Sequence, residues 1–422
     1  MLKRVLEEER KAIALDKKTF AKLKKESKNV VLIFKEEIRR LKILAEPFIG
    51  GSFAKETLLN KEGYDVDIFV RFDWRNERIG DKLKEIVYAV NKRLGYKKEE
   101  VHGSRDYFRL ENKEGVSFEI VPVYKIKNPR EARNVTDLSY FHVNYIRKKL
   151  KGDAIKKEVL LAKKFCAAQG VYGAESYIQG FSGYGLECLI VYYKTFVKML
   201  KGLIKIKERI IIDSEKKYKN ENAILLSLNE SKLKSPIVLI DPTWKERNVL
   251  AALSKESFNK FQEAARKFLE NPSREFFELK RINLDKIKRL SGEFVHIKIY
   301  TDKQAGDIAG TKMKKFSRHL KMELGRYFHI LKEEFNYGEG QEADFYLDVE
   351  SKKEVIKQGP PVGIKLGVIK FKEKNKNVFE KEGRLYSKEK IDFSAKEFIG
   401  KFAKDKKDRL KEMGIIGLKV IN

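Results

Sequence analysis

A glycine pair followed roughly fifteen residues later by two aspartates is the feature that most constrains this chain. The aspartates, Asp65 and Asp67, lie in a segment that alternates like a β-strand. Successive side chains of a strand point to opposite faces of the sheet, so the two carboxylates share one face. The opposite face of the same segment is apolar and comprises Val66, Ile68 and Val70. The pattern therefore predicts a strand with two adjacent carboxylates on one side.

Two carboxylates this close repel each other unless a cation lies between them. Their hard oxygen ligands suit Mg²⁺. The preceding Gly-Gly-Ser loop at 50–52 can bring backbone N–H groups and a hydroxyl close to phosphate oxygens. Either feature alone also occurs at solvated strand edges. Their combination favours a metal-assisted phosphoryl or nucleotidyl transferase.

A third carboxylate is expected, because a two-metal nucleotidyl transferase uses one to serve a metal and to help deprotonate the attacking hydroxyl. The predicted strand at 117–122 offers Glu119, a lone acid on the face opposite to Phe118 and Ile120. A salt-bridged glutamate at a buried edge is the alternative. In a small module with Asp65 and Asp67, we assign Glu119 to catalysis and metal binding.

The composition indicates a protein of about three domains with ample apolar residues for real cores, since 42% of its 422 residues are hydrophobic. No apolar stretch is long enough to span a membrane. The N-terminal residues lack the apolar core of a signal peptide, so we expect a cytoplasmic protein. Cys166 and Cys188 are too few for a disulfide framework or a cysteine zinc site, and they indicate small buried residues in a reducing compartment.

The net charge of +30 favours a polyanionic partner. A lysine-rich composition typical of a hot or AT-rich organism is the alternative explanation for part of this excess. The excess is uneven, because residues 351–422 carry 20 Lys and Arg against 10 Asp and Glu. This distribution indicates a positive surface in the C-terminal part of the chain.

The expected fold is α+β with several domains. Residues 1–135 are predicted to form a compact head, with helices at 20–44 and 82–94 and strands at 46–49, 64–70, 108–111 and 117–122. The first helix should bury a stripe of Val31, Phe34, Ile38 and Leu41.

Residues 136–281 are predicted to form a central domain that opens with an N-cap pair, Thr136 and Asp137. Helices should fill 137–201 with breaks at 170 and 180–185, followed by a loop at 214–235, a strand at 237–240 and a helical run from 241–243 to about 270. Residues 282–422 should form an α+β tail with strands at 293–300 and 345–349, a basic helix at 312–335 and a Gly-Pro-Pro turn at 359–361.

Several motifs occur together in one order. They are Gly51-Ser52-x-x-Lys55-x-Thr57, the Asp65 and Asp67 pair, Glu119-Ile120-Val121-Pro122, Val171-Tyr172-Gly173-Ala174-Glu175-Ser176, Gly180-Phe181-Ser182-Gly183-Tyr184, Asp241-Pro242-Thr243-x-x-x-Arg247-Asn248-Val249 and Gly359-Pro360-Pro361. The first three resemble the head domain of the polymerase-β-like nucleotidyltransferases. The whole set resembles the archaeal-type (class I) CCA-adding tRNA nucleotidyltransferases.

This resemblance implies addition of C, C and A to the 3′ end of tRNA from CTP and ATP, with Mg²⁺ held by the three acids. It implies a central nucleotide-selection domain and a basic tRNA-binding tail. The positions that match the family's nucleotide site are Gly51, Ser52, Lys55, His142, Lys163, Tyr172 and Arg247. Lys55 and Ser52 would hold the triphosphate, Lys163 and Tyr172 would contact phosphate and sugar, and Arg247 would act in base selection.

The chain departs from the family pattern at two positions. Glu119 stands where the family commonly has Asp, and Leu138 replaces an arginine in the stretch that ends at His142. Two other functions stay open: a poly(A) polymerase of the same superfamily, or a non-catalytic RNA-binding protein that retains the fold. The sequence does not fix the oligomeric state, and a homodimer is among the options.

Overall fold

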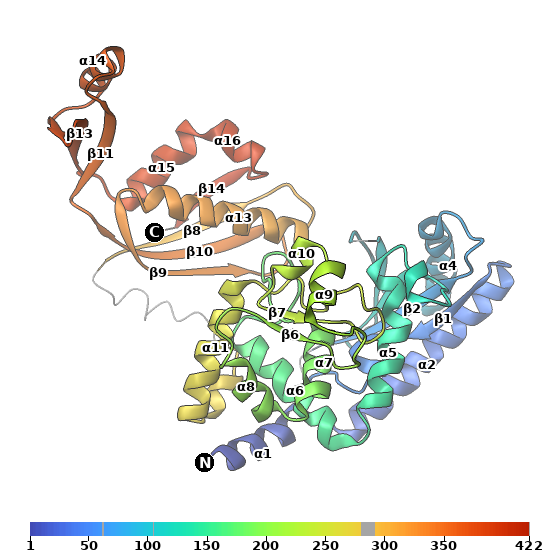
Figure 1. Cartoon of the computed structure of the whole chain (residues 1–422). Helices are drawn as coiled ribbons and strands as arrows, with labels where there is room; N and C mark the ends of the chain where they lie inside the picture. The colour runs from blue at the N-terminus through green and yellow to red at the C-terminus, as the bar shows by residue number, and fades with distance from the viewer. Residues whose placement is uncertain (61–62, 104, 280–291, 422) are drawn as a thin grey trace. The chain divides into compact units, whose positions relative to one another are not determined.

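The computed structural model describes residues 1–60, 63–103, 105–279 and 292–421. The chain divides into two compact units, residues 1–279 and residues 280–422, which are coloured from blue to yellow and from orange to red in Figure 1. The domain boundary predicted between residues 281 and 282 lies outside the described residues. The boundary predicted between residues 135 and 136 falls inside the first unit and stays a prediction.

The first unit contains a five-stranded sheet in the order β1-β2-β5-β4-β3. Its strands are β1 (Ala45–Ile49), β2 (Tyr64–Phe72), β3 (Lys97–Val101), β4 (Tyr107–Glu111) and β5 (Val116–Tyr124). β2 and β5 are parallel, and the other neighbours are antiparallel. Four of these strands were predicted. β3 was missed because its sequence, Lys-Lys-Glu-Glu-Val, has a low strand propensity.

Two helices, α2 (Lys17–Arg40) and α4 (Ile79–Leu94), form one core with the apolar side of β2. Phe34 and Ile38 are buried as predicted, but Val30 is buried in place of Val31. The helix α2 also ends four residues earlier than predicted, with Leu41 as its C-cap. Because these helices cover the apolar side, the aspartates of β2 point to the other face of the sheet.

The rest of the first unit is mostly helical and has a core of its own. Its longer helices are α1 (Leu2–Ile13), α5 (Ser139–Lys149), α6 (Asp153–Ala168), α7 (Gly183–Tyr193), α8 (Phe196–Leu203) and α11 (Lys255–Glu270). The N-terminal helix α1 packs against α6, and it buries Val5, Leu6 and Ile13 in this second core.

Three predictions in this region are wrong. The expected loop at 214–235 contains two short helices, α9 (Glu221–Ser227) and α10 (Glu230–Leu233), each capped by an asparagine side chain. The expected helical run from 241–243 begins only after Ser254, which caps α11, because Asp241 accepts local hydrogen bonds that favour a turn. Asp137 is not an N-cap: Asn134 caps the short 3₁₀ turn Val135–Leu138.

Two short parallel strands complete the unit, β6 (Ile210–Ile212) and β7 (Ile237–Leu239). The second of them was predicted. It leads directly into the turn that carries Asp241 and Arg247.

The second unit has a four-stranded antiparallel sheet in the order β14-β8-β10-β9. The strands are β8 (Glu293–Tyr300), β9 (Phe328–Tyr337), β10 (Glu342–Ser351) and β14 (Gly417–Ile421). Its helices are α13 (Asp307–Leu324), α15 (Ala395–Asp405) and α16 (Lys407–Glu412), and α13 and α15 share a core with the sheet. The helix predicted at 312–335 is wrong beyond Leu324, because residues 328–337 alternate in burial as a strand.

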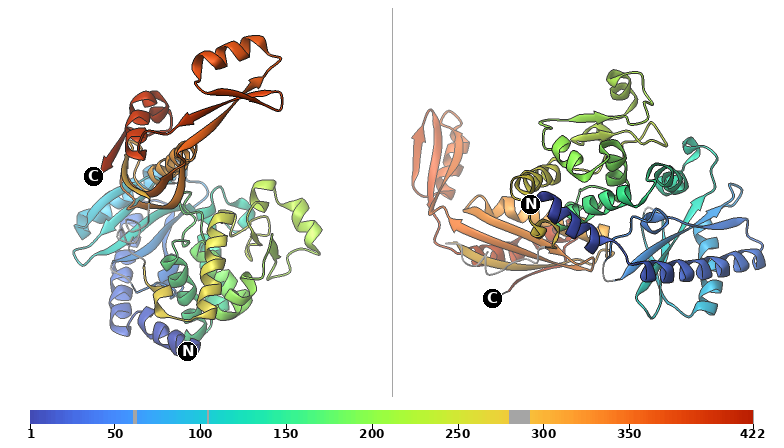
Figure 2. Two further views of the ribbon diagram at one scale, coloured as in Figure 1. Left: turned by 90° about the vertical axis from the view of Figure 1, so that its left-hand side faces the viewer. Right: turned by 90° about the horizontal axis from the view of Figure 1, so that it is seen from below.

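A lobe of three strands and one helix projects from this sheet in both views of Figure 2. It comprises β11 (Glu354–Pro361), β12 (Val378–Lys381), β13 (Arg384–Lys390) and α14 (Lys365–Lys374). The predicted Gly-Pro-Pro turn instead ends β11, an edge strand, where a proline without an N–H is tolerated. A Cβ on Gly359 would lie 2.8 Å from the Phe371 ring, so α14 packs closely there.

The mixed α+β architecture is the one predicted from the sequence. No helix among the described residues is both long and apolar enough to cross a bilayer.

Candidate active site

The acidic residues lie on adjacent parallel strands. The register pairs Asp67 of β2 with Glu119 of β5, and Asp65 with Ser117. Residues paired in this way point to the same side of the sheet, so the structure brings the three predicted acids onto one face. That face is opposite the core formed with α2 and α4.

Asp67 lies in an environment that disfavours its negative charge. Removal from water raises the pKa of Asp67 to about 7, and the charges of Glu119 and Asp65 add to this shift while Lys55 opposes it. The Gly-Gly-Ser loop closes on the same side chain. A Cβ on Gly51, whose φ is +58°, would lie 1.6 Å from Oδ2 of Asp67. Only glycine fits there.

Glu119 is turned toward a cation of the protein. Its Oε1 accepts a hydrogen bond from Nη2 of Arg109 at 3.2 Å. Among the described residues, no group of three acidic, histidine or cysteine side chains converges on one metal position. The strand register and the oxygen chemistry nevertheless fit a divalent cation at Asp65 and Asp67. Glu119 would add to them a carboxylate that also contacts Arg109.

The two predicted phosphate-binding lysines meet at a buried carboxylate that the sequence analysis did not identify. Glu187 of α7, which has no exposed surface, accepts from Nζ of Lys55 at 2.6 Å and from Nζ of Lys163 at 2.8 Å. Thr57 also donates its hydroxyl to Glu187, at 2.7 Å. Burial alone would raise the pKa of Glu187, but the two ammonium groups outweigh it and lower the pKa to about 2. Glu187 is therefore ionised and joins three separate segments.

Tyr172 and Ser52 lie beside this cluster. A Cβ on Gly183 would be 3.0 Å from the Tyr172 hydroxyl and 3.8 Å from Cε of Lys163, so Tyr172 and Lys163 converge at the start of α7. The carbonyl of Ser52 accepts the backbone N–H of Thr57 at 2.9 Å, which closes the loop that carries Lys55. Burial raises the pKa of Tyr172, so its phenol stays neutral and can donate.

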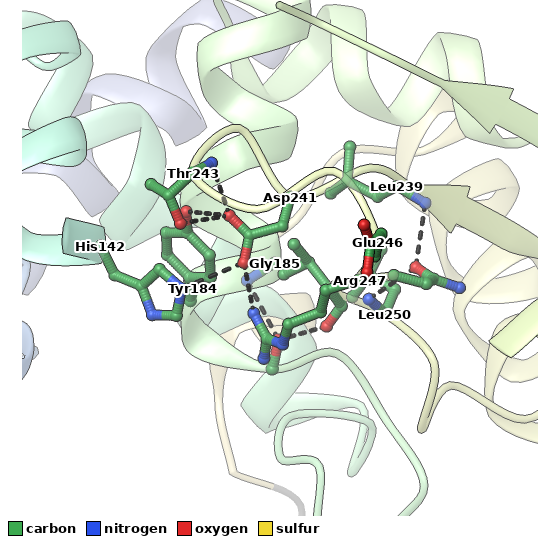
Figure 3. Close-up of polar contacts among 12 residues, drawn as sticks. His142, Tyr184, Gly185, Leu239, Asp241, Thr243, Glu246, Arg247 and Leu250 are labelled. Atoms are coloured by element: carbon green, nitrogen blue, oxygen red, sulfur yellow. Dashed lines mark hydrogen bonds and ion pairs between the residues drawn. The ribbon is translucent and has the colours of Figure 1, made fainter. Parts of the chain in front are cut away.

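The remaining two predicted residues, His142 and Arg247, meet at Asp241 (Figure 3). Oδ2 of Asp241 accepts from Nη1 of Arg247 at 2.7 Å and from Nε2 of His142 at 3.0 Å. Oδ1 accepts from the backbone N–H and the hydroxyl of Thr243, both at 2.8 Å, and from the Tyr184 hydroxyl at 3.2 Å. Burial would raise the pKa of Asp241, but these donors and the charge of Arg247 hold it below its ordinary range.

Tyr184 connects the two cation clusters. Its ring stacks on His142 with centroids 4.0 Å apart, and Nζ of Lys55 lies 5.9 Å from the centre of the ring. Burial lowers the pKa of His142, although its hydrogen bond with Asp241 opposes this effect. The site-residue predictions thus fall into three neighbouring groups, around Asp67, Glu187 and Asp241.

Glu187, Asp241 and Tyr184 were not among the predicted site residues. A lone glutamate in the apolar helix Gly-Tyr-Gly-Leu-Glu-Cys-Leu-Ile-Val is the signal that could have identified Glu187, because a buried acid needs a partner. Leu138, which stands where the family has an arginine, is buried in the core formed by the five-stranded sheet and its helices.

Two family descriptions match the chain. A nucleotidyltransferase domain matches residues 31–139, and the second domain of tRNA nucleotidyltransferases matches residues 157–278. Together they contain every predicted site residue except His142, which lies between the two matched ranges.

Relatives match over most of the chain. The chain is 35% identical over 347 residues to a CCA-adding enzyme of Nanoarchaeum equitans, with 81% of this chain and 82% of that one covered. It is 30% identical over 373 residues to the CCA-adding enzyme of Thermococcus gammatolerans, with 85% and 80% covered.

A solved structure of Cid1, described as having RNA terminal uridylyl transferase activity, superposes with a TM-score of 0.51. At 15% identity, covering 66% of this chain and 98% of that one, it shows a shared fold alone. These two relatives, each covered over about four fifths of its length and at least 30% identical, decide the family. The chain belongs to the archaeal-type CCA-adding enzymes, which are tRNA nucleotidyltransferases.

Proposed function

We propose that this protein completes the 3′ end of tRNA by adding C, C and A from CTP and ATP without a nucleic-acid template. The observation that best supports this is the register of Asp67 beside Glu119, with Gly51 against the Asp67 carboxyl. In each addition the 3′ oxygen of the RNA forms a bond to the α-phosphorus of the nucleotide. The bond between the α- and β-phosphates breaks, and diphosphate leaves.

The carboxylates of Asp65, Asp67 and Glu119 would hold Mg²⁺. The bound cation would supply positive charge to the attacking and leaving oxygens. The chain's own residues prepare this step, because Asp67 has a raised pKa that a cation would lower again. Glu119 would leave Arg109 and accept the proton of the attacking hydroxyl, directly or through water.

Lys55 and Lys163 would contact the triphosphate, with Gly51 and Ser52 alongside and Tyr172 near the sugar. Their shared partner, Glu187, supports this role because it holds the two lysine side chains close together inside the protein. The positions of both cations are already fixed, which reduces the cost of ordering them on binding. Lys163 is buried and donates its three N–H groups to Thr57 and Glu187, so a phosphate contact there would replace one of these hydrogen bonds.

Residues 136–281 would select the nucleotide, with Arg247 as the residue that contacts the base and His142 beside it. The sequence contains one Asp-x-Asp segment preceded by a Gly-Gly-Ser loop, so one site would serve both CTP and ATP. Residues 282–422 would hold the body of the tRNA, because their basic residues suit phosphate contacts that read the shape of an A-form helix. We expect the reaction to take place in the cytoplasm.

The test is to incubate the protein with Mg²⁺, CTP, ATP and a tRNA that lacks its 3′-terminal CCA, and to sequence the products. Three defined additions in the order C, C, A are expected. A ladder of adenylates with ATP alone would instead indicate a poly(A) polymerase. Binding of tRNA without any extension would indicate a non-catalytic RNA-binding protein.

A further inference from the structure

The carboxylate of Asp241 has every acceptor position occupied by a neighbour. Oδ1 receives Thr243 and Tyr184, and Oδ2 receives Arg247 and His142. The residue has no exposed surface, so it cannot touch a nucleotide itself. Its effect on a ligand must pass through the side chains that it holds.

Arg247 and His142 share one oxygen of Asp241, which restricts how each can turn. Arg247 uses Nη1 for this contact, so its other guanidinium nitrogens are the ones that can donate to a ligand. An ionised Asp241 only accepts hydrogen bonds, so His142 carries a proton on Nε2 and its Nδ1 is the nitrogen able to face a ligand. Arg247 is 20% exposed and His142 is 11% exposed, so both reach the surface while Asp241 does not.

The stacking of His142 on Tyr184 restricts the His142 imidazole from a second direction. Tyr184 also donates its hydroxyl to Asp241, so ring and carboxylate hold each other. The contacts with Asp241 and Tyr184 therefore restrict the rotation of the Arg247 guanidinium and the His142 imidazole (Figure 3).

We propose that Asp241 is a positioning residue that sets nucleobase discrimination by fixing the orientation of Arg247 and His142. This rests on the proposed role of Arg247 in nucleotide selection. Only nitrogens that cannot rotate distinguish one base edge from another, because a mobile guanidinium can donate to almost any acceptor. Cytosine and adenine present a ring-nitrogen acceptor where uracil and guanine present an N–H, so a fixed donor there favours the first pair.

The experiment measures kcat/KM for CTP, ATP, UTP and GTP with the full-length chain and truncated tRNA. It uses Asp241→Asn, Arg247→Ala and the double variant. An asparagine has one acceptor oxygen and would place an NH₂ group against donors, so it cannot hold both sets of partners. Asp241→Asn should lower the preference for CTP over UTP roughly ten-fold to a hundred-fold, the factor for losing one hydrogen bond to a charged group. The KM for tRNA should stay unchanged within about two-fold.

The double variant should discriminate no worse than Arg247→Ala alone, because the two residues act as one unit. Glu9→Gln is the matched control. Glu9 is a buried carboxylate that also holds two cations, Arg274 at 2.8 Å and Lys164 at 2.9 Å, but it lies on α1 away from the site. Its loss should lower thermal stability without changing base preference.

The outcomes distinguish failure of the selection role of Arg247 from failure of the positioning role of Asp241. If Arg247→Ala discriminates normally, the proposed role of Arg247 fails. If Arg247→Ala loses discrimination while Asp241→Asn behaves like Glu9→Gln, the positioning role fails. If Asp241→Asn does not fold, Thr243→Val decides, because it removes one donor to Asp241 and keeps the charge. A loss of CTP preference of a few-fold in Thr243→Val supports the proposal, and an unchanged preference overturns it.

Discussion

Asp67 and Glu187 are two poorly solvated carboxylates of the first unit with opposite electrostatic surroundings. Asp67 faces Glu119 and Asp65, and its pKa is raised to about 7. Glu187 faces Lys55 and Lys163, and its pKa is lowered to about 2. The Asp67 carboxylate thus lies mainly beside like charges, whereas the Glu187 carboxylate contacts two ammonium groups.

This difference separates two kinds of site residue. A carboxylate kept beside like charges contributes little to folding, and it is ready for a cation that arrives from solution. A carboxylate enclosed by ammonium groups is part of the folded structure, and it determines where those groups lie. Asp241 belongs to the second kind, because its charge is met by Arg247 and by four other donors.

The largest effect is expected for Asp67→Ala. We expect nucleotide addition to fall more than about a thousand-fold, because a metal ion contributes several kcal/mol to such a step. CTP and ATP incorporation should fall together, and tRNA affinity should stay within a few-fold. Single-turnover assays and filter binding measure the two quantities. Turnover near that of the wild type would show that Asp67 does not hold a cation needed for nucleotide addition, and the contrast between Asp67 and Glu187 would then have no functional meaning.

Glu187→Gln should act mainly on stability. Removal of one partner from a buried ion pair leaves uncompensated charge, so the free energy of unfolding should fall by about 3–5 kcal/mol. Urea denaturation at pH 7 measures this loss. Glu263→Gln provides the control, because Glu263 pairs with Lys267 on the surface of α11 and should change stability far less. Equal losses in both variants would contradict the structural role of Glu187.

The two carboxylates should also give opposite pH dependences in the metal-free protein. The pKa of Asp67 is raised from 3.8 to about 7, so the folded state binds its proton more tightly and loses stability as the pH rises through this range. The pKa of Glu187 is lowered from 4.5 to about 2, so its stabilisation is present above pH 4.5 and is lost as the pH falls.

Urea denaturation in EDTA, from pH 3 to pH 8, tests both signs. The stability of Asp67→Asn relative to the wild type should increase with pH between about 4 and 7. The deficit of Glu187→Gln should shrink below pH 4.5. Parallel curves for either variant would show that its carboxylate does not titrate as described.

The smallest effect is expected from exposed lysines, which lie in water without a buried partner. Reversing Lys401, Lys404, Lys406 and Lys407 to glutamate should raise the KM for tRNA several-fold and flatten its salt dependence. The KM for CTP should hardly change. The same reversals at Lys24, Lys25 and Lys28, which are exposed on α2, provide the control. Steady-state kinetics at two salt concentrations would reject a role of the tail if both sets behaved alike.

The sequence predicted the elements whose pattern is local. The alternation around Asp65 and Asp67 identified β2, and the apolar pattern around Glu119 identified β5. That Asp67 lies directly beside Glu119 depends on the order of the strands in the sheet, which alternation does not contain. Similarly, β9 was predicted as part of a helix because its Lys and Glu residues favour helices, and only the burial of alternate residues in the folded chain identifies the strand.

Two of the partners of the buried carboxylates could not be predicted in this way, because they are distant from the acid in the chain. Lys55 and Glu187 are 132 residues apart, and His142 and Asp241 are 99 residues apart. The signals of an isolated Glu187 in an apolar helix and of Asp241 before a proline were present. Neither signal says which cation would meet the acid.

These separations have a consequence for the order in which a newly made chain matures. The strand that carries Asp65 and Asp67 can form once the head has left the ribosome. Lys55 cannot pair with Glu187, nor His142 with Asp241, until those acidic residues have been synthesised. Contacts that close such long loops form slowly. During synthesis at about 5–20 residues per second, the acidic face therefore exists for several seconds before the cation clusters are complete. A nascent chain should acquire nucleotide binding in one late step, after Arg247 has emerged.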